Sequence, residues 1–267
     1  MTAGQPAAGA RVRQVHPDYA KTAVHHALYL PEDWKPGKRF PVIVEYAGNG
    51  PYSNKFGDIS TGRVEGSNLG YGISGGKGFI WVCLSYLNDA GNANVTQWWG
   101  DKPTFNPGPT IDYCKRTVPW ICEQFGGDPE RVFLVGFSRG AIACNFIGLH
   151  DAEIAKLWRG FVPYSHYDGV RSGWPYPGAD RPSAIARLKR LNGRPQFICH
   201  EGGIPNSSYI SATLEFIEST GVKGSFTYLP TGFRNHNDAW TLRPSPARSA
   251  VRTWLKKYSS GESPRIP

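Results

Sequence analysis

The sequence lacks any apolar run of the roughly 18–20 residues that a helix needs to cross a bilayer. Its first residues, Met1 to Arg11, form a polar segment without the basic region and apolar stretch of a signal peptide. As written, the chain fits a cytoplasmic protein, whereas removal of a leader would fit a secreted one, so the location stays open. We expect no membrane partner.

Motifs for metals and phosphates are missing as well. No His-x-x-x-His or Cys-x-x-Cys spacing occurs, and there is no glycine-rich phosphate loop. We therefore expect neither a metal ion nor another cofactor.

The chain also lacks the clustered basic residues, interleaved with aromatic ones, of a nucleic-acid-binding surface. It has 30 Lys and Arg against 21 Asp and Glu, a net charge of +9, but the basic residues are spread along the chain. The densest group, Arg187 to Arg194, is typical of the exposed face of a helix. A solvated surface is favoured and we expect no nucleic acid partner. The positive electrostatic field of the excess Lys and Arg would also favour acidic substrates.

Cysteines are few: there are five, so they cannot all pair within the chain. Cys83, Cys144 and Cys199 fall in core segments, as small buried hydrophobic residues do. Cys114 and Cys122 flank a helical segment and would pair only if its geometry were irregular. Reduced thiols are favoured throughout.

The most informative motif is the run from Val132 to Ala143, VFLVGFSRGAIA. It is typical of a buried strand, a Gly-x-Ser-x-Gly turn and a helix that begins with small residues. Gly136 and Gly140 permit so tight a corner, which places Ser138 in a strained, exposed position. The helix N-terminus directs partial positive charge at an anion forming there. The sequence therefore predicts a nucleophilic serine, against the alternative of an ordinary strand–helix crossover.

Strand and helix patterns alternate along the chain. Apolar, β-branched runs predict strands at 25–31, 40–46, 78–86, 131–136, 161–165, 195–200 and 224–229. Helical spacing predicts helices at 111–125, 141–150, 183–191, 206–220 and 246–258. This alternation indicates an α/β protein with one mainly parallel sheet covered on both sides.

The segment at 118–141, VPWICEQFGGDPERVFLVGFSRGA, resembles α/β-hydrolases. Its helix, Gly-x-Asp-Pro-x-Arg link and elbow follow in the order of the esterase branch that includes polyhydroxybutyrate-depolymerase-like and feruloyl- or acetylxylan-esterase-like enzymes. Tyr29-Leu-Pro fits the same branch, and the resemblance covers about 24–258. The resemblance implies a single α/β-hydrolase domain at 21–260 with a mostly parallel central sheet flanked by helices. The polar N-terminal residues predict a flexible tail at 1–20, and we expect a C-terminal tail at 261–267.

The resemblance implies a serine, an acid and a histidine in that order along the chain. His236 follows the last predicted strand and is the only histidine after residue 200, so we expect it to take the Ser138 proton. The alternative is an ordinary surface histidine. His166 and His200 follow strands on the same rim, and we expect them to line the pocket.

Two carboxylates compete for the role of the acid. The resemblance places it just after the strand that ends at His200, where Glu201 stands in a loop without the usual aspartate. The alternative is Asp168, after the strand at 161–165, where glucuronoyl-esterase-like hydrolases carry their acid. Glu201 is favoured, and for either residue the structural alternative is a loop carboxylate in a cap or a salt bridge.

An oxyanion hole needs two backbone N–H groups aimed at the developing charge. By the family pattern, one comes from Arg139 and the other from the loop after the strand at 40–46, where Asn49 is favoured over Gly48. The Arg139 side chain is either a ligand for a substrate carboxylate or a structural ion-pair partner.

Aromatic residues crowd the loops expected at the mouth of the site. Rigid rings of this kind stack on sugars or aromatic acids, although loop packing is an equal alternative for Trp98 and Trp99. The candidates for substrate binding are Tyr52, Trp98, Trp99, Trp174, Tyr176 and Trp240.

Together these features predict a serine esterase that cleaves carboxylic esters, among them carbohydrate- or aromatic-linked ones, through an acyl-enzyme. The substrate is a small molecule or is linked to a polymer, and the oligomeric state stays open. One alternative is a peptidase of the prolyl-oligopeptidase type, which would usually need an extra propeller or lid domain. Another is a non-catalytic glycan-binding module on a hydrolase fold.

Overall fold

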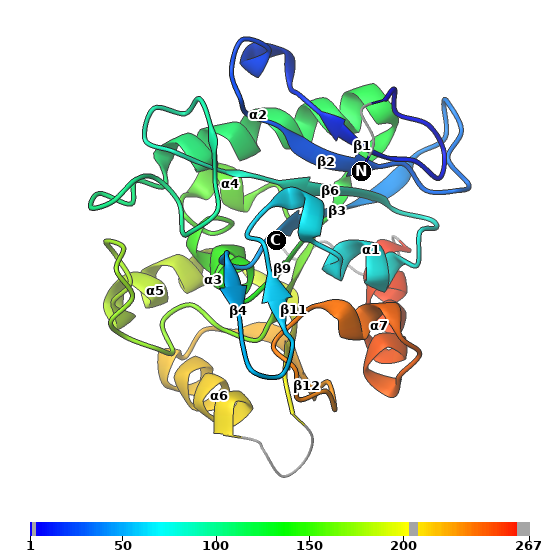
Figure 1. Ribbon diagram of the computed structural model, residues 1–267. Coiled ribbons are helices and arrows are strands. Elements are labelled where there is room, and N and C mark those ends of the chain that lie inside the picture. The colour runs from blue at the N-terminus through cyan, green and yellow to red at the C-terminus, as the bar shows by residue number, and fades with distance from the viewer. Residues whose placement is uncertain (2–3, 203–207, 261–267) are drawn as a thin grey trace.

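The computed structural model describes residue 1 and residues 4–202 and 208–260. In these ranges, eight strands form one sheet in the order β1-β2-β6-β3-β9-β10-β11-β12. The strands from β6 to β12 in this order run parallel, whereas β1 and β2 pair antiparallel at one edge. The predicted α/β class and mostly parallel sheet are confirmed (Figure 1).

All strands of this sheet except β1 overlap the predicted apolar runs. They are β1 (Arg11–Gln14), β2 (His26–Tyr29), β3 (Phe40–Tyr46), β6 (Ile80–Leu84), β9 (Gly127–Phe137), β10 (Gly160–Tyr164), β11 (Gly193–His200) and β12 (Gly224–Pro230). Two small hairpin pairs lie in loops outside it: β4 (Tyr52–Ser53) with β5 (Ile59–Ser60), and β7 (Tyr86–Leu87) with β8 (Asn94–Val95).

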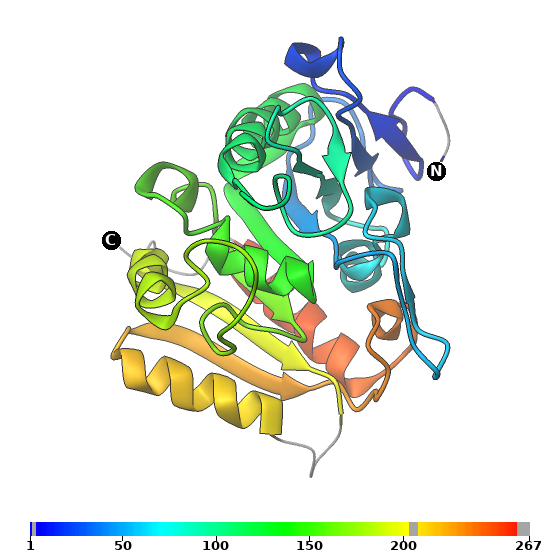
Figure 2. The same ribbon diagram turned by 60° about the vertical axis from the view of Figure 1, so that its left-hand side comes forward.

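Helices cover both faces of the sheet, and Figure 2 shows α7, in red, behind it and α3, in green, in front. One face is covered by α1 (Leu69–Ser74) and α7 (Pro246–Ser259), and the other by α2 (Gly108–Phe125), α3 (Arg139–Phe146), α4 (Ala152–Ala155), α5 (Arg181–Leu188) and α6 (Ser208–Thr220). Short 3-10 turns are η1 (Pro17–Tyr19), η2 (Val64–Gly66), η3 (Lys189–Leu191) and η4 (Ala239–Leu242). None of the helices in the described ranges is long and apolar enough to span a membrane.

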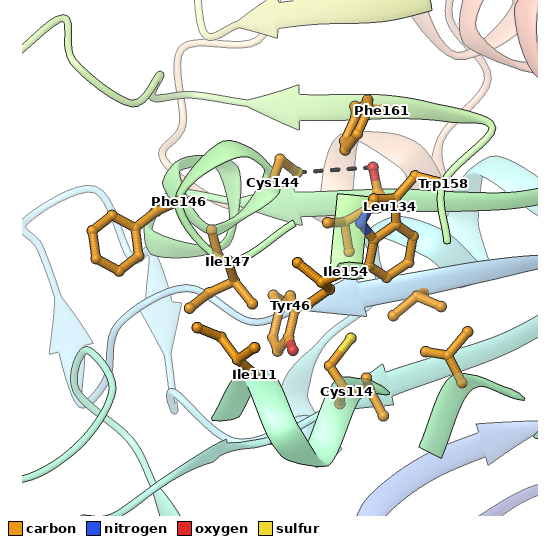
Figure 3. Close-up of a cluster of buried hydrophobic side chains, with 14 of the residues drawn as sticks. Tyr46, Ile111, Cys114, Leu134, Cys144, Phe146, Ile147, Ile154, Trp158 and Phe161 are labelled. Carbon is orange, nitrogen blue, oxygen red and sulfur yellow. Dashed lines mark hydrogen bonds between the residues drawn. The ribbon is translucent and has the colours of Figure 1, made fainter. Parts of the chain in front are cut away.

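The central strands are apolar along their length because both of their faces are covered. All of β3 is buried: Val42 and Val44 belong to one core cluster and Ile43 to the other. Figure 3 shows part of the first cluster, where Cys114 of α2 lies near Tyr46 of β3. All five cysteines are buried and free, in line with the expected reduced thiols.

The expected tail at residues 1–20 is wrong in part. Residues 11–14 form β1, which pairs with β2, and Val12 is buried in the core. The Arg11 guanidinium lies 4.3 Å from the centre of the Trp81 ring. A four-residue strand with one buried apolar side chain is too short for its alternation to stand out. The expected tail at 261–267 lies outside the described residues.

The turn between β9 and α3 fits against the carboxyl end of β3 with no space to spare. A Cβ built on Gly140 would lie 1.9 Å from the Tyr46 carbonyl oxygen, and one on Gly136 would lie 2.1 Å from the Gly140 carbonyl oxygen. Both clashes are with main chain, which cannot swing aside. Glycine at these two positions is therefore required by the packing of the turn.

Gly140→Ala is expected to lower the free energy of unfolding by about 3 kcal/mol because the new methyl group overlaps a main-chain carbonyl. Gly91→Ala is the matched control: its Cβ would lie 3.5 Å from Pro109, so only its left-handed backbone opposes the change. That control should lose about 1 kcal/mol. Urea unfolding of both variants measures the difference, and equal losses would contradict the steric argument.

Candidate active site

Ser138 sits at the apex of the turn in a strained conformation. Its φ is 56° and its ψ is −113°, a combination of backbone angles that residues other than glycine rarely adopt. The Ser138 N–H donates to the Tyr164 carbonyl oxygen of β10 at 3.0 Å, which anchors the turn from the neighbouring strand. The hydroxyl group therefore projects at the carboxyl edge of the sheet.

His236 lies between Ser138 and Glu201. Its Nε2 is 3.2 Å from Ser138 Oγ and its Nδ1 is 2.5 Å from Glu201 Oε1. The imidazole packs edge-on against the Tyr52 ring, whose centre is 5.5 Å away, and at a tilt against the Phe137 ring, at 4.7 Å. The serine, imidazole and carboxylate thus form one chain of contacts, drawn from the ends of β9, β12 and β11.

The structure brings Glu201, and not Asp168, to the histidine. Burial opposes ionisation of Glu201, but hydrogen bonds from His236 and Ser165 hold its pKa below the usual value. Asp168 instead accepts two hydrogen bonds from the buried Arg187 guanidinium, at 2.8 and 3.0 Å. Asp168 is thus the structural carboxylate of the two, in a salt bridge of the kind weighed from the sequence.

Ser165 is a residue of the site that sequence reasoning missed. It follows β10 directly, with a left-handed φ of 89°. Its hydroxyl lies 3.2 Å from His236 Nδ1 and 3.0 Å from His166 Nδ1. Serine is common in loops, so no signal in one sequence separates this residue from its neighbours.

Asp58 was also missed, although it holds the histidine loop in place. It lies between β4 and β5, is 2% exposed, and its carboxylate accepts the His236 N–H at 2.9 Å across 178 residues of sequence. The side-chain amides of Asn54, Asn235 and Asn237 donate to the same carboxylate. Burial opposes ionisation, but these donors outweigh it and lower the pKa of Asp58. The two asparagines that flank His236 were the available clue.

The Arg139 side chain is buried beneath the loop that follows β3. Its guanidinium donates to the carbonyl oxygens of Gly48 at 2.9 Å, Trp98 at 2.5 Å and Gly62 at 3.3 Å. Burial lowers the pKa of Arg139 to about 10, so it stays charged at neutral pH. The sequence suggested a substrate ligand or an ion-pair partner. The Arg139 side chain is neither, and instead it holds main-chain carbonyl groups together by hydrogen bonds.

Gly48 lies beside Ser138. A Cβ built on it would be 3.4 Å from Ser138 Cβ and 3.0 Å from the Phe137 ring. The Asn49 side chain turns the other way and accepts the Trp98 N–H at 2.8 Å. The main chain of this loop therefore passes next to Ser138.

Four of the six aromatic residues expected at the mouth of the site are buried instead. Trp99 is 0% exposed and stacks on Phe146 at 4.4 Å, and Trp240 is 2% exposed and packs against Tyr164. This corrects the expectation that both line the mouth of the site, because a sequence does not distinguish core tryptophans from rim tryptophans. Trp98 and Tyr176 are also buried, whereas Trp174 is half-buried and Tyr52 exposed.

A cavity of about 700 Å³ adjoins His236 on the side of Glu201. Its walls include Glu201, His236, Ser165 and the two expected pocket residues, His166 and His200. Within the described residues, no group of three or more His, Cys, Asp or Glu is arranged to hold a metal ion.

Comparison with known proteins identifies the fold. No protein-family model and no curated protein matches the chain. Among solved structures, it is similar to a truncated carbohydrate esterase from gut microbiota, at 12% identity and a TM-score of 0.61 over 96% of this chain and 99% of the other. It is also similar to Thermogutta terrifontis esterase 2 phosphorylated by paraoxon, at 14% identity and a TM-score of 0.57 over 93% and 92%.

Some similar structures are much longer than this chain. This chain covers 62% of the length of a thermostable esterase. It covers 33% of Porphyromonas gingivalis dipeptidyl peptidase 4, which is 14% identical with a TM-score of 0.52 over 88% of this chain. Such low identities show the fold alone, which is that of the α/β-hydrolases.

Asp58→Asn is expected to lower the free energy of unfolding at pH 7 by about 1–3 kcal/mol, because an amide NH₂ would face groups that are themselves donors. A carboxyl group with a lowered folded pKa stabilises the fold above its unfolded pKa of about 4. That contribution disappears as the pH falls through the folded pKa. The difference between wild type and variant should therefore shrink below about pH 4.

Urea unfolding at pH 7 and at pH 3.5 measures both effects of the Asp58 substitution. Asp18→Asn is the control because its exposed carboxylate forms only an exposed ion pair with Arg116, at 3.1 Å, and a longer contact with His16, at 3.9 Å. Its loss should stay below about 1 kcal/mol. A difference for Asp58→Asn that grows at low pH would rule out the proposed role of its charge.

Proposed function

We propose that the protein is a serine hydrolase that cleaves carboxylic esters through an acyl-enzyme. The observation that carries this proposal is the chain of contacts from Ser138 through His236 to Glu201 at a strained strand–helix turn. The esterases that share its fold support it, and we assign the activity to the predicted α/β-hydrolase domain at 21–260. The proposal includes no cofactor, nucleic acid or membrane partner and leaves the oligomeric state open.

In the proposed reaction, Ser138 Oγ attacks the ester carbonyl carbon while His236 Nε2 takes its proton. The tetrahedral intermediate collapses, His236 gives the proton to the leaving alcohol, and an acyl group stays on Ser138. Water, deprotonated by His236, then releases the acid and restores the serine. Glu201 fixes the tautomer with the proton on Nδ1 and stabilises the imidazolium that forms.

The oxyanion hole is proposed to consist of the Arg139 and Asn49 backbone N–H groups. The position of Arg139 at the start of α3 supports the first. For the second, the Gly48 carbonyl points at the Arg139 guanidinium. Because C=O and N–H of one trans peptide point in opposite directions, the Asn49 N–H faces away from that guanidinium. The Gly48 N–H is the alternative donor.

The substrate class remains part of the proposal. One similar structure is named as a carbohydrate esterase, and Tyr52 and Trp174 present ring surface near His236 and His166. Rings of this kind suit a sugar or an aromatic group. We therefore include carbohydrate- and aromatic-linked esters, small or polymeric, among the substrates.

Ser138→Ala is expected to reduce turnover of p-nitrophenyl acetate by at least about 10⁴-fold because the nucleophile is lost. A fluorophosphonate probe should label wild type and the control Ser53→Ala, which changes an exposed serine of β4, but not Ser138→Ala. A folded wild type that is neither labelled nor active would favour the glycan-binding module. Faster cleavage of dipeptide p-nitroanilides than of esters would favour the peptidase.

Glu201→Gln and Asp168→Asn are expected to fail in different ways. The first should lower kcat by up to about 10⁴-fold with the fold retained, because the imidazole loses its orienting charge. The second should cost about 3–5 kcal/mol of stability because it leaves the buried Arg187 guanidinium without its counter-charge. Ester kinetics and urea unfolding of both variants test this. The reverse pattern would exchange the roles of the two carboxylates.

A further inference from the structure

The cavity beside His236 carries two arginines that the proposed reaction does not use. Arg171, from the loop after β10, and Arg234, from the loop after β12, lie on its walls. Both side chains are exposed. Within the described residues, neither guanidinium forms an ion pair or a hydrogen bond with another residue. The buried Arg187 and Arg139, in contrast, are fully engaged.

The two guanidiniums outweigh the other charges of the cavity. Glu201 is the carboxylate among its lining residues, and that group is engaged by His236. Burial lowers the pKa of both His166 and His200 to about 4, so these walls are neutral at pH 7. The cavity therefore has a net positive charge and unused hydrogen-bond donors.

Arg171 is also held in position. Its guanidinium carbon lies 4.4 Å from the centre of the Trp174 ring, and Trp174 packs in turn against His166. Stacking on an aromatic face limits the freedom of a guanidinium but leaves its N–H groups available in the ring plane. Such a fork matches the two oxygens of a carboxylate.

We propose that this cavity binds a free carboxylate on the alcohol half of the substrate, through Arg171 and Arg234. The inference rests on the proposed ester hydrolysis. His236 hands the leaving alcohol its proton through Nε2, and the same imidazole is one of the residues that line the cavity, so we place the alcohol half of the substrate toward the cavity. Preferred substrates are therefore esters of alcohols or phenols that carry a carboxylate, such as an acylated hydroxy acid or uronic acid.

The test compares 3-acetoxybenzoate with the neutral 3-acetoxybenzamide, which has the same shape. The ratio of their kcat/KM values is measured in wild type, Arg171→Gln, Arg234→Gln and both together. Each single change should lower this ratio about fivefold, as expected for an exposed ion pair, and the double variant should lower it further. Taking ratios cancels the intrinsic reactivity of the two esters.

Lys223→Gln is the control for the loss of one positive charge. It is exposed and precedes β12, at the edge of the sheet opposite the site, so the ratio should not change. Raising the salt concentration to 0.5 M should lower the wild-type ratio, because exposed charges are screened. A ratio that is the same in wild type and in both arginine variants would overturn the proposal. The proposal would also be overturned if the enzyme preferred only esters with the carboxylate on the acyl half, such as the p-nitrophenyl monoester of adipate.

Binding separates failure of this inference from failure of the proposed function. If wild type hydrolyses neither ester, the proposed hydrolysis fails, and the cavity is then tested by calorimetric titration with 3-hydroxybenzoate. Weaker binding to the double variant than to wild type and Lys223→Gln would support the carboxylate site. Equal binding, or none, would overturn it.

Discussion

The close approach between the turn that carries Ser138 and the end of β3 is the constraint on which the site depends. Gly140 lies against the Tyr46 carbonyl with no room for a side chain. This contact brings Arg139 under the next loop, where its guanidinium gathers the carbonyls of Gly48, Gly62 and Trp98. The position of Ser138 and the shape of the loop beside it thus follow from one piece of packing.

The other half of the site is assembled from loops that are distant in sequence. Glu201 and Ser165 meet His236 from the ends of β11 and β10. Asp58 holds the same histidine loop from the hairpin formed by β4 and β5. Parallel strands bring their carboxyl ends to one edge of the sheet, so residues far apart along the chain become neighbours there. The sheet order sets which loops meet, and the hydrogen bonds set how they are oriented.

The sequence predicted those parts of the molecule that depend on local patterns. Buried parallel strands are continuous apolar runs, and the Gly-x-Ser-x-Gly turn has few structural solutions, so β3, β9 and Ser138 were recognisable. Glu201 after β11 was favoured over Asp168 because of the resemblance to α/β-hydrolases. Asp58 and Ser165 were not predictable because their roles come from contacts across the fold. Trp99 and Trp240 look like rim aromatics in the sequence, and only the packing shows that they are buried.

The backbone strain at Ser138 bears on why the chain retains this residue. A serine at φ 56° and ψ −113° costs about 1–3 kcal/mol relative to a relaxed conformation. Glycine adopts such angles freely, so replacing Ser138 by glycine would stabilise the fold. A protein selected for stability alone would drift toward that glycine. The serine thus opposes folding, and a scaffold that only bound its ligand would gain nothing from keeping it.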